Sequence, residues 1–333
     1  MSLNVGVLGS GSWGTTIASL VSHNAPTRLW GRNPDTVREI NEQHSNADYL
    51  PGLTLSKRLK ADSDIENVIK SSDLIVMGVP SKAFRETLLY VKENVRPWVP
   101  IVSLAKGFEL KTKFRMTQVI KEILPDHPCG VLTGPNLARE IAGGQAAASV
   151  LAMEEPTMLT RLQPVFHSGL FRVYTNTDLV GCELGGALKN VIAIAAGMGD
   201  GAGAGDNTRS AVITRGLAEM TRLGVAMGGR TETFAGLAGM GDMIATCTSS
   251  LSRNHHVGEE LGKGRKLDDI IDEMNMVAEG VKSSRVVMEL SEEYDVDMPI
   301  AREVFRVCHE GSTARRAFRG LLRQGTGSEA DPG

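Results

Sequence analysis

The sequence predicts an α/β protein: an amino-terminal domain with a parallel sheet, followed by a second, all-helical domain. Three observations favour this fold class. Short apolar segments alternate with helical segments up to about residue 177, a glycine-rich turn follows the first of them, and β-branched runs become scarce afterwards. The chain of 333 residues is also longer than one hydrophobic core usually supports. We therefore expect domains over residues 1–177 and 178–324, and a disordered tail over 325–333.

The first domain reads as repeated units of strand and helix. Its expected strands are residues 3–8, 27–30, 74–79, 100–104, 130–133 and 147–151. Helical patterns lie between several of these strands, at residues 13–22, 33–43, 82–91 and 113–124. This alternation is typical of βαβ units, and nearly all-apolar strands are typical of a parallel sheet that is buried on both faces.

The second domain is expected to consist of long helices rich in Ala, Gly, Met and Leu. Two Gly-rich stretches, residues 197–207 and 236–242, interrupt the helical pattern. We expect both stretches to be loops, because clusters of Gly mark turns and loops.

The composition excludes several classes of partner. A net charge of -3 at pH 7 gives no overall positive field for nucleic acid, so an anionic ligand needs a local basic cluster. The four cysteines lie far apart and match no metal-ligand spacing, so we expect reduced thiols and no metal site. We find no amino-terminal signal sequence and no run of about 18 apolar residues. These observations lead us to expect a cytoplasmic protein without membrane insertion.

A glycine motif lies between the first expected strand and the first expected helix. Gly9, Gly11 and Gly14 form the pattern G-x-G-x-x-G. In a dinucleotide-binding site the first glycine permits a tight turn, the second lets the pyrophosphate approach the backbone, and the third lets helix and strand pack closely. Because the motif stands where this mechanism requires it, we expect a Rossmann-type domain that binds NAD(P).

The residue after the second expected strand selects the adenosine ribose. NAD-specific proteins place Asp or Glu there, whereas this chain has Gly31, Arg32 and Asn33. Arg32 can pair with the 2'-phosphate of NADP(H). We therefore expect NADP(H) to be preferred and NAD(H) to be possible; the alternative is that Arg32 is an ordinary surface arginine.

A lysine stands in an otherwise apolar helical segment. Between Leu184 and Met198 the only polar side chains are Lys189 and Asn190, so the helix has no solvent-facing side and should be buried. Burial disfavours the charged form of a lysine, which suits it to proton exchange near neutral pH. Lys189 is our catalytic candidate, with Asn190 or Asp242 holding its ammonium group; Asp242 alternatively serves as a helix N-cap.

Further polar residues suit a phosphate group. Ser252, Arg253 and Asn254 precede a helical stretch and combine N-cap groups, free backbone N–H groups and a guanidinium. Lys106 follows a strand at the carboxyl edge of the sheet, where ligands of such sheets bind. Gly134 lies in a turn before Asn136. The adjacent residues His255 and His256 cannot face one point on a helix, which argues against a metal site there.

These motifs together resemble the bacterial NAD(P)-dependent glycerol-3-phosphate dehydrogenase family. The matching segments are GSGSWGTTIA (9–18), LWGR (29–32), VP (79–80), SLAKGFE (103–109), GPNLARE (134–140), ELGGALKNVIAIAAGMGDG (183–201), GLAGMGDMIATCTSSLSRN (236–254) and VAEGVKS (277–283). The resemblance implies interconversion of sn-glycerol 3-phosphate and dihydroxyacetone phosphate, supply of glycerol 3-phosphate for phospholipid synthesis, and a homodimer.

The resemblance also implies roles for single residues. Lys189 matches the family's proton donor and acceptor. The implied substrate contacts are Lys106, Gly134, Asn136, Lys189, Asp242, Ser252, Arg253 and Asn254. The implied cofactor contacts are Ser12, Trp13, Arg32, Lys106, Ala138, Arg253, Val277 and Glu279, in addition to the three glycines. Asn136 departs from the family, in which a serine is commoner at this position.

Two other functions fit parts of the pattern. A β-hydroxyacid dehydrogenase or a ketopantoate reductase also combines a Rossmann domain, a helical domain and a catalytic lysine. The Ser252-Arg253-Asn254 segment and Lys106 favour a phosphorylated substrate over these alternatives. A non-catalytic NADP(H) sensor would leave the buried Lys189 unexplained, although a fold alone does not define a function.

Overall fold

A computed structural model of the chain describes residues 3–274 and 278–322. Contacts group the chain into two compact units. Unit 1 comprises Met1–Glu109 and Phe114–Leu179, and unit 2 comprises Leu110–Lys113 and Val180–Gly333. The sequence-based division at 177/178 into folding domains stays a prediction, and the expected tail at 325–333 lies outside the described residues.

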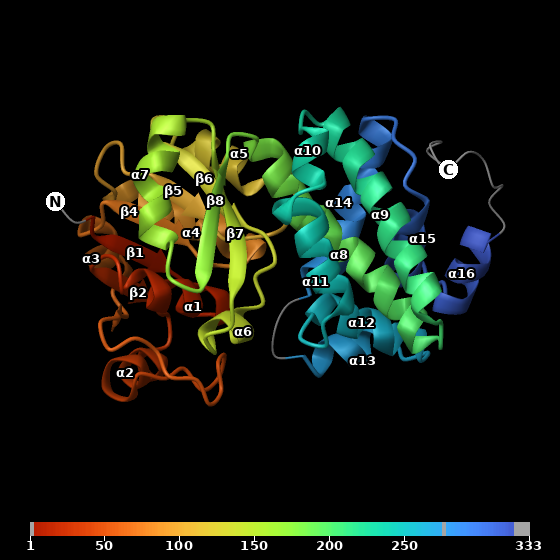
Figure 1. The fold of residues 1–333 in the computed structure, drawn as a ribbon, viewed down its shortest axis with the longest axis horizontal. Helices are drawn as coiled ribbons and strands as arrows, with labels where there is room; N and C mark the ends of the chain where they lie inside the picture. Colours follow the sequence, from red (N-terminus) through yellow and green to blue (C-terminus); the bar gives the residue numbers. More distant parts are fainter. Residues whose placement is uncertain (1–2, 275–277, 323–333) are drawn as a thin grey trace. The chain divides into compact units, whose positions relative to one another are not determined.

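Unit 1 contains an eight-stranded sheet with the order β3-β2-β1-β4-β5-β6-β7-β8 (Figure 1). The strands are β1 Val5–Leu8, β2 Thr27–Trp30, β3 Lys60–Asp62, β4 Leu74–Met77, β5 Ile101–Ser103, β6 Cys129–Thr133, β7 Ala147–Met153 and β8 Phe171–Asn176. The first six strands are parallel and have the order of a dinucleotide-binding sheet. The predicted α/β fold class is therefore confirmed.

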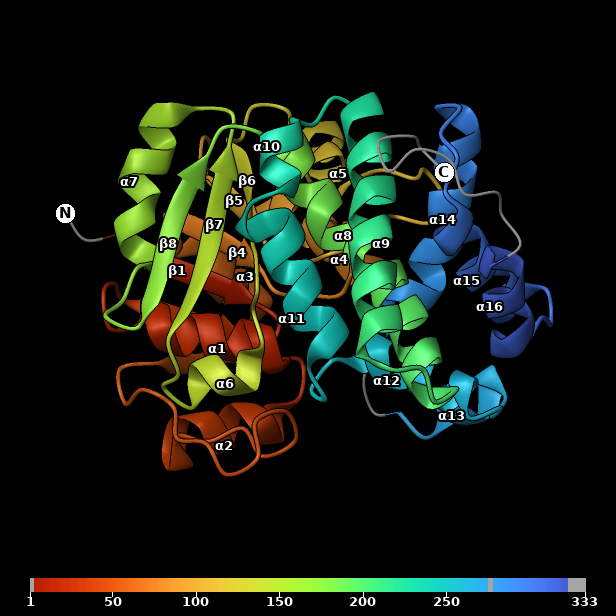
Figure 2. The same ribbon diagram turned by 45° about the vertical axis from the view of Figure 1, so that its right-hand side comes forward.

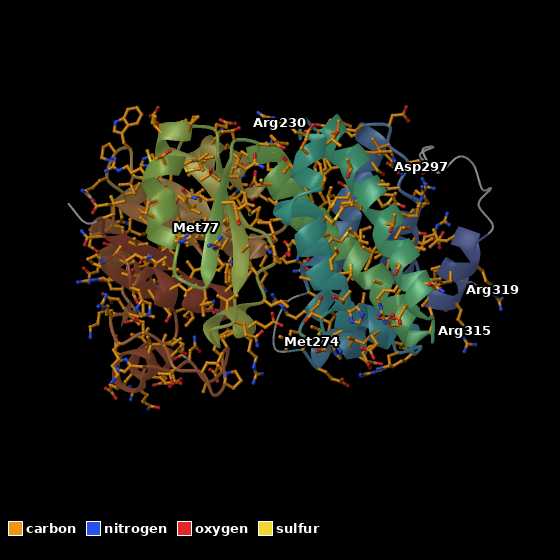
Figure 3. All side chains as sticks on the ribbon, in the orientation of Figure 1. Met77, Arg230, Met274, Asp297, Arg315 and Arg319 are labelled. Atoms are coloured by element: carbon orange, nitrogen blue, oxygen red, sulfur yellow. The ribbon has the colours of Figure 1, made fainter. Side chains whose placement is uncertain are left out.

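Helices cover both faces of this sheet (Figure 2). They are α1 Ser12–Val21, α2 Pro34–Gln43, α3 Ile65–Lys70, α4 Ser81–Asn94, α5 Met116–Ile123, α6 Ala138–Ala142 and α7 Pro156–Phe166. Successive residues of a central strand point into two hydrophobic cores, one on each face of the sheet. On β4, Val76 packs with α1 and α7, whereas Met77 (Figure 3) packs with α3, α4 and α5. This double burial explains why the central strands are apolar throughout.

The sheet differs from the sequence-based expectation in three strands. β7 runs antiparallel to β6, so the expectation of a wholly parallel sheet is wrong at this point. The apolar pattern that identifies a strand carries no information about its direction. The edge strands β3 and β8 were not expected: β3 is short and polar, whereas β8 shows the alternating burial of a half-exposed strand.

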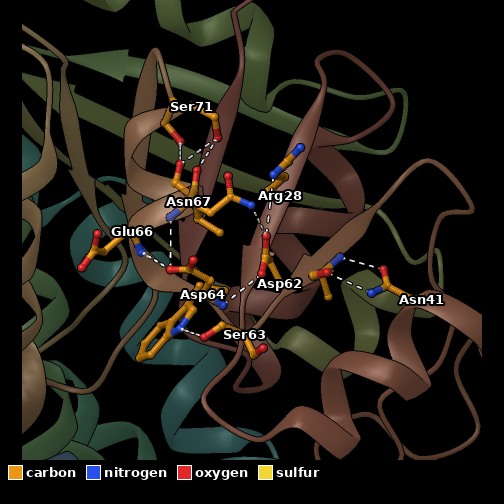
Figure 4. Close-up of polar contacts among 12 residues, drawn as sticks. Arg28, Asn41, Asp62, Ser63, Asp64, Glu66, Asn67 and Ser71 are labelled. Carbon is orange, nitrogen blue, oxygen red and sulfur yellow. Dashed lines mark hydrogen bonds and ion pairs between the residues drawn. The ribbon is translucent and has the colours of Figure 1, made fainter.

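Polar contacts attach the edge strand β3 to its neighbouring helices (Figure 4). Asp62 accepts a hydrogen bond from Asn67 at 2.6 Å and lies 3.6 Å from the guanidinium of Arg28 on β2. Asp64 caps the N-terminus of α3 through the backbone N–H groups of Glu66 and Asn67. Because β3 is short and has few apolar side chains, these polar contacts hold it in place at the edge of the sheet.

Unit 2 contains helices and no strand within the residues that the structure describes. Its helices are α8 Leu179–Gly201, α9 Asp206–Ala226, α10 Thr231–Phe234, the π-helical turn η1 Leu237–Gly241, α11 Asp242–Thr248, α12 Arg253–Gly262, α13 Leu267–Asp272, α14 Glu279–Glu293, α15 Pro299–His309 and α16 Ala314–Leu322. α8 is long and apolar enough to cross a membrane by composition, but 94% of its apolar window is buried inside the protein. Glu183, Lys189 and Asn190 interrupt its apolar sequence, and α8 is a core helix.

Both Gly-rich stretches of unit 2 are largely helical, so the expectation of loops is wrong. Residues 197–201 continue α8, and residues 237–241 form η1. The glycines permit close helix packing: a Cβ on Gly197 would lie 2.1 Å from the carbonyl oxygen of His255, and one on Gly201 would lie 1.9 Å from that of Glu259. Gly258 on α12 approaches α8 in the same way. Within these stretches, residues 202–205 and Gly236 form the connections between helices.

Candidate active site

The glycine motif of unit 1 has the geometry that its sequence suggests. Gly9 has φ +120°, and a Cβ there would lie 2.8 Å from the carbonyl oxygen of Gly78 at the end of β4. A Cβ on Gly14 would lie 2.1 Å from the carbonyl oxygen of Gly9. A Cβ on Gly11, in contrast, would meet nothing within 4 Å. Gly11 is the N-cap of α1, so open space lies beside the N-terminus of this helix.

This open space fits a dinucleotide pyrophosphate, because N–H groups at a helix N-terminus bind anions. Ser12 and Trp13 form the first turn of α1. Ser12 donates a hydrogen bond to the carbonyl oxygen of Tyr49 at 3.1 Å, and Trp13 packs edge-to-face on Phe171 with ring centroids 6.1 Å apart. The buried Nε1–H of Trp13 has no hydrogen-bond partner among the described residues.

Asn46 supports the glycine turn and was not identified from the sequence. Its fully buried amide donates to the carbonyl oxygen of Ser10 and to the hydroxyl of Thr15, both at 2.9 Å. Asn46 lies in an irregular segment far from the motif along the chain, and no local pattern indicates this contact.

Arg32 follows β2 and is exposed to solvent. Gly31 before it is buried, and a Cβ there would lie 3.1 Å from Ser10 of the glycine turn. Asn33 caps α2 by accepting a hydrogen bond from the backbone N–H of Asp35 at 2.9 Å. The guanidinium of Arg32 has no carboxylate within ion-pair distance in the described ranges, so it is available to an anion.

Lys106, Gly134 and Asn136 lie together after β5 and β6. The ammonium of Lys106 donates to the carbonyl oxygen of Gly134 at 2.6 Å. Gly134 has φ +124°, a conformation that favours glycine. The hydroxyl of Ser149 on β7 donates to Oδ1 of Asn136, while the buried Nδ2 of Asn136 has no partner among the described residues. Ala138 begins α6, and its carbonyl oxygen accepts a hydrogen bond from Thr16 of α1 at 3.3 Å.

Lys189 of unit 2 is buried, with 5% of its surface exposed. Its ammonium lies 2.8 Å from Oδ1 of Asp242 and also donates to the hydroxyl of Thr246. Thr246 in turn donates to the carbonyl oxygen of Asp242 at 2.6 Å. Asp242 is the first residue of α11, whose N-cap is Gly241, so the alternative of an N-cap role for Asp242 is wrong.

Thr246 was missed at the sequence level, although it lies one helical turn beyond Asp242. That spacing places both side chains on one face of α11 toward α8. Cys247 follows it in the same buried region. Burial raises the pKa of the Cys247 thiol to about 12, opposed by the charge of Lys189, so this thiol is neutral and unsuited to nucleophilic chemistry.

Asn190 and Asn254 connect α8 to α12. Nδ2 of Asn254 donates to Oδ1 of Asn190 at 2.9 Å, and Oδ1 of Asn254 accepts from the backbone N–H of Gly280 at 2.9 Å. Ser252 is the N-cap of α12, accepting from the backbone N–H of His255 at 3.2 Å. The predicted helix-start chemistry of this segment is therefore observed, and Asn254 orders three helices.

Arg253 is accessible at the first turn of α12. Desolvation by the surrounding protein lowers the pKa of Arg253, and the nearby charge of Glu279 partly offsets this shift. Glu279 begins α14. Val277, the remaining expected cofactor contact, lies outside the described residues.

His255 pairs with a carboxylate of α8. Its Nε2 lies 2.7 Å from Oδ2 of Asp200 at the carboxyl end of α8, and Asp200 also pairs with Arg209 of α9. No group of three or more His, Cys, Asp or Glu residues within 3–274 and 278–322 has metal-binding geometry.

Unit 1 has the strand order and the glycine turn of a dinucleotide-binding domain, as nicotinamide-dependent dehydrogenases do, and unit 2 holds a buried lysine–carboxylate pair. Comparison with known proteins specifies the family. Residues 4–159 match the family model of the NAD-dependent glycerol-3-phosphate dehydrogenase N-terminus, and residues 178–319 match that of its C-terminus. The chain belongs to the NAD-dependent glycerol-3-phosphate dehydrogenase family and is an oxidoreductase.

Individual relatives agree with this family. The chain is 63% identical to the NAD(P)+ glycerol-3-phosphate dehydrogenase 2 of Sphingopyxis alaskensis over 100% of both chains. The crystal structure of glycerol-3-phosphate dehydrogenase from Coxiella burnetii matches with a TM-score of 0.92 and 35% identity, over 97% of this chain and 99% of that one.

A ketopantoate reductase from Ralstonia eutropha matches with a TM-score of 0.61 and 14% identity, over 95% of this chain and 100% of that one. At this identity the likeness concerns the fold alone.

Proposed function

We propose that the chain interconverts sn-glycerol 3-phosphate and dihydroxyacetone phosphate with NAD(P)H, and that Lys189 is the general acid and base. The observation that carries this proposal is the buried contact between Lys189 and Asp242 on neighbouring helices of unit 2. Asp242 compensates the buried ammonium, and Thr246 adds a second acceptor. The family of the chain supports the substrate.

The hydrogen bonds of Lys189 suit proton exchange. An ammonium group has three N–H bonds, and Asp242 and Thr246 accept two of them. The third N–H is left to donate to the oxygen on C2 of the substrate. When the ketone is reduced this oxygen gains the proton, and in the reverse direction the neutral amine accepts it. Bound nicotinamide supplies or accepts the hydride at C2.

The remaining polar residues are proposed to bind the phosphorylated substrate. Arg253 and the N-terminus of α12 offer a guanidinium and backbone N–H groups, which suit a dianionic phosphate. Lys106 adds positive charge beside Gly134 and Asn136. Ser252 and Asn254 act chiefly by fixing the start of α12, because their side chains already form hydrogen bonds.

The cofactor is proposed to be NADP(H), with NAD(H) also accepted. The open space at Gly11 supports binding of either dinucleotide, and the exposed guanidinium of Arg32 supports the preference for NADP(H). The unpartnered Nε1–H of Trp13 suits an acceptor on the cofactor. The further proposed cofactor contacts are Gly9, Ser12, Gly14, Lys106, Ala138, Arg253, Val277 and Glu279.

The cellular role is proposed on the strength of the family. Supply of glycerol 3-phosphate for phospholipid synthesis, a cytoplasmic location and a homodimer are the expectations that follow from it. A ketopantoate reductase or β-hydroxyacid dehydrogenase activity is the competing proposal. An assay of NADPH oxidation with dihydroxyacetone phosphate, unphosphorylated dihydroxyacetone and ketopantoate separates these proposals, because we expect turnover only with the phosphorylated ketone.

Replacing Lys189 tests the proposed mechanism. We expect Lys189→Ala to lower kcat by at least about 10²-fold, the scale of a positioned general acid, with little change in NADPH affinity. Lys282→Ala, at an exposed lysine of α14, is the matched control and should keep normal turnover. Since Lys189→Ala leaves Asp242 buried without its partner, the double variant Lys189→Met, Asp242→Asn removes both charges. Near-normal turnover in a folded Lys189→Ala protein would refute the mechanism.

A further inference from the structure

We propose that Ser149 is a positioning residue for the substrate, acting through the amide of Asn136. The hydroxyl of Ser149 donates to Oδ1 of Asn136 and thereby turns the NH2 group of Asn136 toward an acceptor oxygen of the phosphorylated substrate. This inference rests on the proposed function, because it deepens the substrate contact proposed for Asn136.

The reversed direction of β7 brings Ser149 to this place. Lys106 and Gly134 follow the carboxyl ends of the parallel strands β5 and β6. Because β7 is antiparallel to β6, its first half lies at the same edge, with Val150 opposite Thr133. A Cβ on Gly134 would lie only 3.3 Å from Cα of Ser149, so the Gly134 turn packs directly on β7.

The hydrogen bonds of the Asn136 amide show which of its two polar atoms is left for a ligand. Oδ1 of Asn136 accepts from Ser149, whereas Nδ2 is buried and has no partner among the described residues. A buried donor without a partner destabilises the protein, so a ligand acceptor at this position would remove that cost. The hydroxyl of Thr133, on a fully buried side chain beside Gly134, also lacks a partner in the described part of the chain.

The charge of the neighbourhood indicates the kind of ligand. The Lys106 ammonium lies 2.6 Å from the Gly134 carbonyl oxygen, so positive charge is held at the same turn as the unpartnered amide N–H. Donors and a cation together suit an oxygen of an anionic substrate. Ser149 itself is fully buried and does not need to touch the substrate to act.

The experiment compares KM for dihydroxyacetone phosphate with kcat. We expect Ser149→Ala to raise this KM by roughly 5- to 10-fold, the value of one hydrogen bond, with kcat and NADPH affinity within about 2-fold of the wild type. Ser149→Thr and Ser149→Val form a matched pair, because both side chains have the same shape and suit a strand. Only the Thr variant keeps the hydroxyl, so we expect its KM to lie well below that of the Val variant.

A double-mutant cycle separates positioning from general packing. If Ser149 acts through Asn136, Ser149→Ala has no further effect on KM in an Asn136→Ala background. Equal effects of Ser149→Ala in both backgrounds, or equal KM values for the Thr and Val variants, would overturn the proposal. Absence of dihydroxyacetone phosphate reduction by the wild type would instead overturn the proposed function. An active wild type with no change in KM on Ser149→Ala would overturn only the inference about Ser149.

Discussion

Single residues of this chain are informative where their polarity conflicts with their surroundings. Lys189 is the clearest example, because one cation in an apolar helix requires a partner. The sequence identifies this residue and suggests Asn190 or Asp242 as its partner, and the structure shows the contact with Asp242. It does not reveal Thr246, since the contact between α8 and α11 depends on the packing of two helices.

Arg32 gives a prediction about cofactor choice. We expect Arg32→Ala to raise KM for NADPH about tenfold or more, because a charge-assisted hydrogen bond to the 2'-phosphate contributes about 1.5–3 kcal/mol. KM for NADH should stay nearly unchanged, since NADH lacks this phosphate. Steady-state kinetics with both cofactors, in the wild type and in Arg32→Ala, measures the ratio of the two KM values.

The control for Arg32 is Arg161→Ala. Arg161 is an exposed arginine of α7 and lines a cavity with Leu3, Asp73 and Pro100, which precede β1, β4 and β5. It therefore lies at the edge of the sheet opposite Arg32, and its removal should leave both KM values unchanged. If the ratio of KM for NADPH to KM for NADH were unchanged in Arg32→Ala, Arg32 would not contribute to cofactor specificity.

At the scale of elements, periodicity predicts the central strands and the helices better than their directions or connections. The residue ranges of β2, β4 and α2 agree closely with the pattern, because apolar strands and an N-cap are local signals. The direction of β7 is not local, which is why Ser149 could not be found from the sequence. The prediction of a loop at residues 197–201 was wrong for a related reason. The glycines there permit close contact between α8 and α12, which a local pattern does not reveal.

A buried carboxyl group connects α9 to the start of α15 and predicts a pH effect on stability. Glu219 accepts hydrogen bonds from the backbone N–H groups of Ile300 at 2.7 Å and Ala301 at 3.2 Å. Burial raises the pKa of Glu219 to about 7, and these two hydrogen bonds oppose the shift. The folded state therefore binds a proton more tightly than the unfolded state, in which the pKa is near the usual value for Glu.

We expect the contribution of Glu219 to the free energy of unfolding to be largest below the usual pKa of a glutamate. As pH rises toward about 7, this contribution should fall by at most roughly 1.4 kcal/mol per pH unit. Above that pH it should stay constant. Glu219→Gln removes this slope, which urea unfolding at a series of pH values can measure. Glu232→Gln, at an exposed carboxylate of α10, should keep it. If the free energy of unfolding of the wild type and of Glu219→Gln changed equally with pH, Glu219 would not be the source of the pH dependence.

For the whole molecule, the small net charge of -3 means that ligand recognition depends on local groups. Basic side chains are also found away from the candidate site: Arg315 and Arg319 of α16 are exposed and extend outward (Figure 3). We therefore expect Lys106, Arg253 and the starts of α1 and α12, rather than the total charge, to select anionic ligands.

The proposed cofactor site at the glycine motif predicts that NADPH binding stabilises the whole protein. Ligand that binds only the folded state adds about 2.7 kcal/mol at a concentration of 100 times Kd, so NADPH should raise the Tm of the wild type. Gly11→Ser puts a side chain into the open space beside α1 while keeping a favourable N-cap. We expect its ligand-free Tm to stay near the wild type and its response to NADPH to be largely lost.

Gly14→Ala should behave in the opposite way in the same thermal-shift measurement. Its Cβ would lie 2.1 Å from the carbonyl oxygen of Gly9, so the variant should lose stability already without ligand. This measurement distinguishes the two glycines of the motif: we expect Gly11 to provide room for the cofactor, and Gly14 to provide room for the packing of α1 on the glycine turn. A full NADPH response in Gly11→Ser would show that the pyrophosphate does not approach the backbone at this residue, which would contradict the proposed cofactor site.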